Sequence, residues 1–301
     1  MSARKASLAE FLTPEVVSRL ENMEIRARLI VEGFIAGLHR SPYHGFSVEF
    51  AEYRQYNSGE STRNIDWKIY AKTDRYYVKV FEDETNLRAT LIVDRSASMG
   101  FSSTPVSKLQ YASYLAAALS YLMIKQRDAV GLVTFDEKIS TIVPHHSFRG
   151  HLLNLLRTLE GIEPGAKTAI SRTLHEMAER LKRRGLIVLF SDLMDEPQEV
   201  IDGLKHFRHR GHEILVFHVL DPIELTLDIP KEVQFEDLET LERLRTQPWF
   251  LKKDYRRSVT EWMNFLEGEC KDNAIDYNLV VTDRSFDEAL MQYLNKRRKL
   301  R

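Results

Sequence analysis

This sequence of 301 residues has a single cysteine, only short apolar runs and no excess of either charge. The single cysteine, Cys270, excludes an intrachain disulfide and is typical of a reducing compartment. Lys and Arg number 43 against 44 Asp and Glu, so the charge balance gives no general attraction to nucleic acid or to an acidic membrane.

The apolar stretches are also too short to cross a membrane. Tyr111–Ile124 is the longest candidate helix and is interrupted by Ser113 and Ser120, whereas a span needs about 20 residues. The first ten residues lack the apolar core of a secretory signal. These features predict a cytoplasmic protein without a membrane span.

From residue 88 onward, strand-like apolar runs alternate with helical patterns. This alternation indicates an α/β fold, a doubly wound and mostly parallel sheet with helices on both faces. Residues 221–250 interrupt it with two prolines, the strand-like Val233–Phe235 and a short acidic helix, which we interpret as an excursion from the sheet edge. The expected strands are 89–94, 129–135, 139–143, 186–191, 213–219 and 276–281, and the expected helices are 107–126, 148–159, 169–183, 197–209, 254–272 and 286–298.

Residues 1–87 are expected to form a small α+β unit before the main domain of residues 88–301. Thr13-Pro14 is typical of a helix start and predicts one helix over 13–37. The unit also carries many polar and aromatic side chains, which either hold it to its neighbour or face a partner. We expect strands at Phe46–Phe50 and Tyr76–Phe81 and a short helix through Asp66-Trp67, and the polar and aromatic group is Arg54, Arg63, Asp66, Trp67 and Arg75.

The segment Ala89–Gly100 suggests a metal site. Its apolar run predicts a buried strand that ends in Asp94. Asp94 would then lie at the carboxyl end of the strand, where open α/β sheets bind ligands. Ser96 and Ser98 follow at alternate positions, so a tight loop could bring three hard oxygens together, as Mg²⁺ prefers. Taken alone, the same residues are also ordinary helix caps and turn formers.

Two later loops add oxygens at the same end of the predicted sheet. Thr168 lies at the entrance of the helix 169–183, where it is either a ligand or an N-cap. Asp192 follows the strand 186–191, where it is either a ligand or a turn former. The candidate ligand set is therefore Asp94, Ser96, Ser98, Thr168 and Asp192.

These five residues resemble the metal-ion-dependent adhesion site of von Willebrand factor A domains. In those domains the site consists of Asp-x-Ser-x-Ser after the first strand, a Thr in a later loop and an Asp after the fourth strand. All five positions match in this sequence. The resemblance implies a bound Mg²⁺, or another divalent cation such as Mn²⁺, with the carboxylates often acting through water.

The upstream segment carries a second pattern, made of Glu49-Phe50, Arg54, Tyr56, Gly59, Arg63, Ile65-Asp66-Trp67 and Lys79, with His218–Asp221 and Val281-Thr282-Asp283 further on. This pattern resembles the family called domain of unknown function 58, from which Glu60 departs where Asp is expected. The resemblance implies partnership with a MoxR-type AAA+ ATPase in the assembly, activation or maturation of another complex.

We therefore expect a non-enzymatic, metal-dependent protein–protein interaction module, in which an acidic side chain of the partner completes the metal's coordination. The alternative is a magnesium-dependent hydrolase or phosphoryl-transfer enzyme using the same cluster. Against it, the sequence has no phosphate-binding Gly-rich Lys-Ser/Thr loop, and Arg95 stands where an aspartyl-phosphate motif has its second aspartate. A third alternative is an interaction protein whose metal site stays empty.

Overall fold

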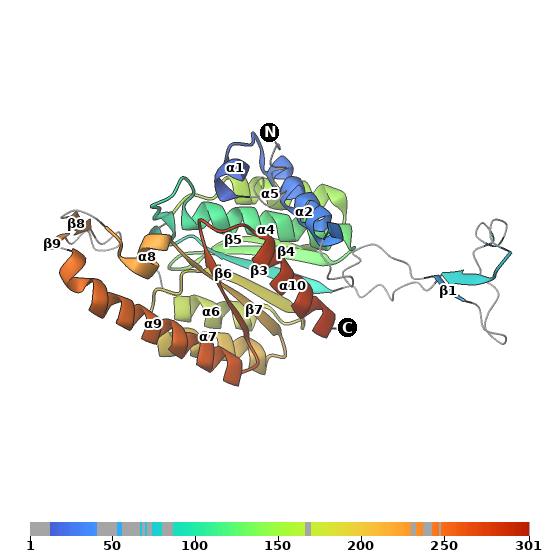
Figure 1. Cartoon of the computed structure of the whole chain (residues 1–301). Coiled ribbons are helices and arrows are strands. Elements are labelled where there is room, and N and C mark those ends of the chain that lie inside the picture. Colours follow the sequence, from blue (N-terminus) through green and yellow to red (C-terminus); the bar gives the residue numbers. More distant parts are fainter. Residues whose placement is uncertain are drawn as a thin grey trace, which may run out of the picture.

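The computed structural model describes most of the chain after residue 87 and shorter parts before it (Figure 1). The described residues are 13–40, 53–55, 67, 70, 74–79, 87–165, 170–229, 233–236, 243–246 and 248–300.

A six-stranded sheet forms the centre of the fold, in the order β10-β7-β6-β3-β4-β5. All neighbouring pairs are parallel except β4 and β5, which are antiparallel at one edge. This is the strand order of doubly wound nucleotide-binding folds, and it confirms the predicted α/β class, a doubly wound, mostly parallel and Rossmann-like sheet. The strands are β3 (Arg88–Asp94), β4 (Ala129–Phe135), β5 (Ile139–His146), β6 (Leu186–Ser191), β7 (Glu213–Leu220) and β10 (Asp276–Val281).

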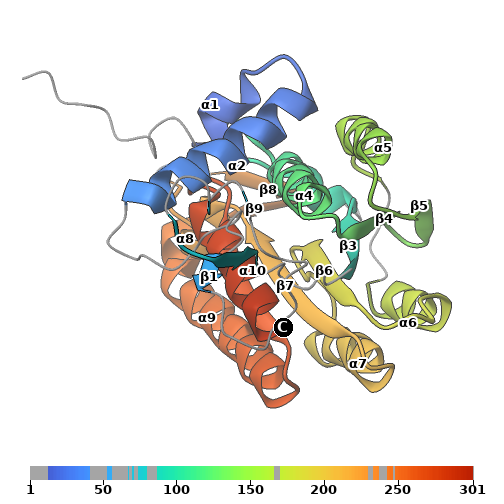
Figure 2. The same ribbon diagram turned by 90° about the vertical axis from the view of Figure 1, so that its right-hand side faces the viewer.

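Helices cover both faces of this sheet (Figure 2). Because successive side chains of a strand point to opposite faces, Leu91 and Val93 of β3 join one hydrophobic cluster and Ile92 joins the other. The first cluster includes α4 (Lys108–Lys125), α5 (Arg149–Glu160) and α10 (Asp287–Lys299), and the second includes α6 (Ile170–Arg180), α7 (Pro197–His209) and α9 (Pro248–Asp272).

The N-terminal region contains two helices where one was predicted over 13–37. They are α1 (Pro14–Ser18) and α2 (Met23–Arg40). The side chain of Asn22 accepts a hydrogen bond from the backbone N–H of Ile25 at 2.9 Å and so starts a new helix. Apolar residues of α2 pack into the first cluster, so this helix is part of the main core.

The excursion after β7 begins with α8 (Pro222–Thr226) and contains a two-stranded antiparallel ribbon of β8 (Val233–Glu236) and β9 (Arg243–Thr246). The strand at Val233–Phe235 is confirmed. Most of the acidic stretch where a short helix is predicted, residues 237–242, lies outside the described residues. The strand β9, which pairs with β8, is an element that the sequence did not predict. The following helix begins at Pro248, earlier than predicted.

A further two-stranded ribbon pairs β1 (Tyr53–Gln55) with β2 (Tyr77–Lys79), the latter within the predicted strand Tyr76–Phe81. The predicted strand Phe46–Phe50 lies outside the described residues, as does most of the predicted Arg63–Trp67 block. Across the described chain, no helix combines the length and apolar character required to traverse a bilayer.

Candidate metal centre

Two neighbouring strands bring the predicted carboxylates together. β3 and β6 pair in parallel with Val93 opposite Phe190, so Asp94 and the Ser191-Asp192 turn leave the same end of the sheet. Both Asp94 and Asp192 are fully buried. The prediction that these carboxylates meet at one rim of the sheet agrees with this register.

The loop after β3 gathers its polar groups around Asp94. The Asp94 Oδ1 atom accepts a hydrogen bond from the Ser96 N–H at 2.8 Å, and the hydroxyls of Ser96 and Ser98 lie 3.1 Å apart. A short 3-10 helix, η3 (Ala97–Gly100), starts here, but the side chain of Ser96 makes no capping bond to it. Ser96 is therefore not a side-chain helix cap. Asp94 does act as a turn former, because its side chain accepts from the backbone N–H two residues further on.

Asp192 also combines a turn with a charge contact. Its Oδ1 accepts from the Met194 N–H at 3.3 Å, and its Oδ2 accepts from the Lys108 Nζ at 2.8 Å. Leu193, between these residues, has a φ of +52°, a strained conformation for a side chain that branches. Residues in such sparsely populated backbone conformations cluster at functional sites.

Thr168 lies outside the described residues. The loop that leads to it starts close to the candidate site, because the Gly165 N–H donates to the Arg95 carbonyl at 2.6 Å. A Cβ atom on Gly165 would overlap the carboxylate of Asp136, so the loop passes close to that side chain.

Lys108 is a site residue that the sequence analysis missed. Its ammonium lies between Asp192 and Glu224, which accept hydrogen bonds at 2.8 and 2.6 Å, and its side chain is fully buried. Burial lowers the pKa of this ammonium, but the two carboxylates outweigh burial, so the pKa of Lys108 is raised and it stays charged. A lysine in the first turn of a helix is unfavourable beside the positive end of the helix dipole. This unusual position is the feature of the sequence that could have indicated a role for Lys108.

Asp94 has no cation of its own among the described residues. Burial raises the pKa of Asp94 to about 7, with the charge of Asp192 adding to the effect. Hydrogen bonds from Ser96 and from the Ser191 hydroxyl, which donates to Asp94 Oδ2 at 2.6 Å, only partly oppose it. The ionised site is therefore short of positive charge.

His218 contacts the backbone of Asp192 but no side chain of the candidate ligand set. Its Nε2–H donates to the Asp192 carbonyl at 2.9 Å, and its Nδ1 accepts from the Tyr277 hydroxyl at 2.5 Å. Burial lowers the pKa of His218 to about 4, so the ring is neutral in this tautomer. Both ring nitrogens are used in positioning the Asp192 turn.

The donor set suits a hard divalent cation. Within the described residues, no three His, Cys, Asp or Glu side chains converge closely enough to hold a metal, so hydroxyls must supply part of any coordination shell. Asp94, Ser96 and Ser98 offer only oxygen atoms, which suit Mg²⁺ or Mn²⁺. Asp192 Oδ2 is held by Lys108, which fits a contact to the metal through water.

Comparison with protein families gives one decisive match. The profile of the family described as "Protein of unknown function DUF58" matches residues 52–262, which is more than half of the chain. The chain belongs to the DUF58 family. This DUF58 protein is also 27% identical, over 230 residues, to uncharacterized proteins of Mycobacterium bovis and Mycobacterium tuberculosis, covering 75% of this chain and 72% of each relative.

Solved structures similar to the DUF58 protein include BatB from Bacteroides thetaiotaomicron, which is 19% identical with a TM-score of 0.48. That match covers 71% of this chain and 99% of the other. A second is an aerotolerance-related membrane protein from Bacteroides fragilis, at 20% identity and a TM-score of 0.49, covering 70% and 99%. A third is the SpRpn10 VWA domain, at 8% identity and a TM-score of 0.42, covering 69% and 95%.

Proposed function

We propose that this DUF58 protein is a non-enzymatic interaction module that binds partner proteins through a divalent cation. The observation that carries the proposal is the charge of the candidate site. Asp94 and Asp192 are fully buried and Glu224 is largely buried, and the Lys108 ammonium pairs with Asp192 and Glu224, which leaves Asp94 without a counter-charge among the described residues. Buried charges are normally paired or bound to metal. A divalent cation would offset this excess.

The proposed ligands are Asp94, Ser96 and Ser98, with Asp192 acting through water and Thr168 as a further ligand. Ser98 is only half-buried, so the hydroxyl side of the site faces outward. A cation held by two hydroxyls and few carboxylates keeps much of its charge, which an acidic side chain of the partner would match. Because the resemblance of this chain to DUF58 proteins implies such a partnership, we propose a MoxR-type AAA+ ATPase as that partner.

The hydrogen bonds near the site support a binding role over catalysis. The Ser191 hydroxyl donates to Asp94 and accepts from the Leu193 N–H, and both ring nitrogens of His218 are engaged. The hydroxyl that contacts a carboxylate, that of Ser191, is fully buried and already accepts from the backbone, so it is not accessible to a substrate as an activated nucleophile must be.

Calorimetric titration of the partner ATPase tests this proposal. We expect binding to wild-type protein in Mg²⁺, and at least tenfold weaker binding in EDTA or with Asp94→Asn. Asp202→Asn, an exposed carboxylate on α7, is the matched control and should bind like wild type. Equal affinity in Mg²⁺, in EDTA and for Asp94→Asn would overturn the metal-bridged interaction, and phosphoester turnover lost in Asp192→Ala would favour the enzyme alternative.

A further inference from the structure

The two edges of the central sheet are built differently. β5 carries Pro144 and irregular register against β4, features that discourage pairing with another strand. β10 at the opposite edge pairs with β7 in unbroken register from Asp276 to Val281 and has neither proline nor lysine. Among the described strands, none pairs with the outer side of β10.

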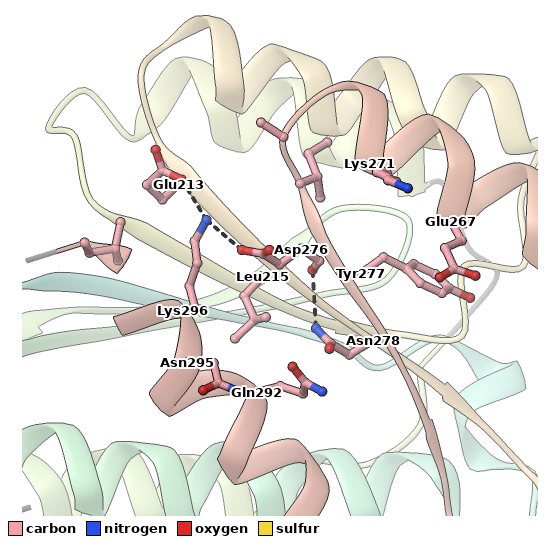
Figure 3. Close-up of a pocket in the computed structure, with 13 residues that line it drawn as sticks. Glu213, Leu215, Glu267, Lys271, Asp276, Tyr277, Asn278, Gln292, Asn295 and Lys296 are labelled. Atoms are coloured by element: carbon pink, nitrogen blue, oxygen red, sulfur yellow. Dashed lines mark hydrogen bonds and ion pairs between the residues drawn. The ribbon is translucent and has the colours of Figure 1, made fainter. Parts of the chain in front are cut away.

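A hollow of about 650 Å³ lies along the first half of β10, between α9 and α10 (Figure 3). Glu213 and Ile275, near the amino ends of β7 and β10, line it, so it lies at the sheet end opposite the candidate metal centre. On its floor Lys296 bridges Glu213 and Asp276 at 2.7 and 2.8 Å. The floor charges are thus already paired.

The rim of the hollow carries four polar side chains without hydrogen-bond or ion-pair partners in the described structure, and a fifth, Asn278, with one long hydrogen bond. Glu267 and Lys271 project from α9 one helical turn apart, both exposed, and they are not paired with each other (Figure 3). Gln292 and Asn295 line the other side from α10 and are uncharged. The Asn278 amide reaches the Asp276 carbonyl only at 3.5 Å, the limit of a hydrogen bond.

This arrangement is self-complementary. If a second copy pairs antiparallel with β10 about a two-fold axis perpendicular to the sheet, α9 meets α9 and α10 meets α10. Glu267 of one copy then faces Lys271 of the other, twice per dimer. The amides of Gln292 and Asn295 each donate and accept, so they also suit their own symmetry mates.

We infer that the open edge of β10, with the hollow between α9 and α10, is a homodimer interface that joins two sheets into one. The partner is a second copy of this chain, which covers the hollow with its own β10 edge, α9 and α10. The main-chain groups of the edge strand provide hydrogen bonds, and the α9 charges set the register. The inference is independent of the metal centre.

Sedimentation velocity of the full chain, over about a hundredfold range of concentration, tests the inference. Wild type should dimerise reversibly and equally in Mg²⁺ and in EDTA. Lys271→Glu replaces two attractive pairs by two repulsive ones and should raise the dimer dissociation constant at least tenfold. The combined variant Glu267→Lys with Lys271→Glu should restore wild-type dimerisation, whereas Lys253→Glu, an exposed lysine elsewhere on α9, should have no effect.

Cysteine cross-linking tests the strand pairing itself. Asn278 is near the middle of β10, so Asn278→Cys places two thiols near the proposed axis, within reach of a disulfide. The native Cys270 is buried and should not compete. A monomeric wild type, a dimer indifferent to Lys271→Glu, or a combined variant that fails to recover would each overturn the inference.

Discussion

Lys108 is the residue on which the charge balance beside Asp192 depends. It is the counter-charge to two carboxylates that the sheet and α8 hold away from solvent. Its position at the start of α4 also ties that helix to the turn after β6 and to α8. A single side chain therefore links three segments that are distant in the sequence.

Lys108→Met should lower the free energy of unfolding by about 3 kcal/mol, because Asp192 would remain fully buried, and Glu224 largely buried, without a cation. Denaturant unfolding monitored by circular dichroism measures the loss. The exposed Lys253→Met should change stability by less than about 0.5 kcal/mol. A Lys108→Met protein as stable as its control would show that the ammonium is dispensable.

Asp94→Asn removes the charge of this side chain and keeps its size and shape. At pH 8 in EDTA the variant should be more stable than wild type by about 1 kcal/mol or more, because the fold disfavours the ionised carboxyl. Wild type should gain about 2.7 kcal/mol in Mg²⁺ at a hundred times its dissociation constant, and the variant nothing. Thermal unfolding with and without Mg²⁺ gives both values, and an equal Mg²⁺ response in the two proteins would remove Asp94 from the ligand set.

Among the elements, β5 is held to the sheet partly by His145. Its Nδ1 accepts from Arg88 at 2.8 Å, and its Nε2 lies 2.8 Å from the hydroxyl of Thr90. Its ring also packs so closely on Gly131 that a Cβ atom there would lie 2.8 Å from it. The edge strand thus depends on a neutral imidazole.

Acid should weaken this attachment. Burial, with the charge of Arg88, lowers the pKa of His145 from 6.5 to about 4, so the unfolded chain takes up the proton first as pH falls. Stability should be full above about pH 6.5 and fall as the pH drops to about 4. Urea unfolding across this range should show a shallower fall for His145→Gln than for wild type, and the exposed His209→Gln should match wild type; equal slopes for His145→Gln and wild type would contradict this role.

At the scale of the whole molecule, the last helix is fixed to the sheet by a buried ion pair. Arg297 of α10 donates to both carboxylate oxygens of Asp128, just before β4, and also to the Tyr293 hydroxyl at 3.1 Å. Asp128 is fully buried and also accepts from the Leu87 N–H. This contact joins the start of the main domain to its last helix.

Arg297→Met should therefore destabilise the entire domain by about 3 kcal/mol, since Asp128 would be left buried and charged. Unfolding followed by circular dichroism and by tryptophan fluorescence should shift together, as expected for one cooperative unit. The exposed Arg298→Met is the control. If fluorescence were unchanged while α10 alone melted, the ion pair would be a local contact only.

The sequence by itself determined the alternation of strands and helices, because burial on both faces of a parallel sheet forces continuous apolar runs. It predicted β4, β6 and β10 with the observed bounds, and it placed Asp94 and Asp192 at strand ends. These features depend on local periodicity and on the rule that parallel strands end at one rim. It also predicted one N-terminal helix where Asn22 starts a second.

Only the tertiary structure decided what surrounds those carboxylates. Lys108 is 84 residues from Asp192 and 116 from Glu224, so no local pattern relates their charges. The same holds for His218, which looks like an ordinary strand residue until it is found beneath Asp192. Contacts between distant segments are set by how helices pack on the sheet, and packing is a property of the whole chain rather than of any window within it.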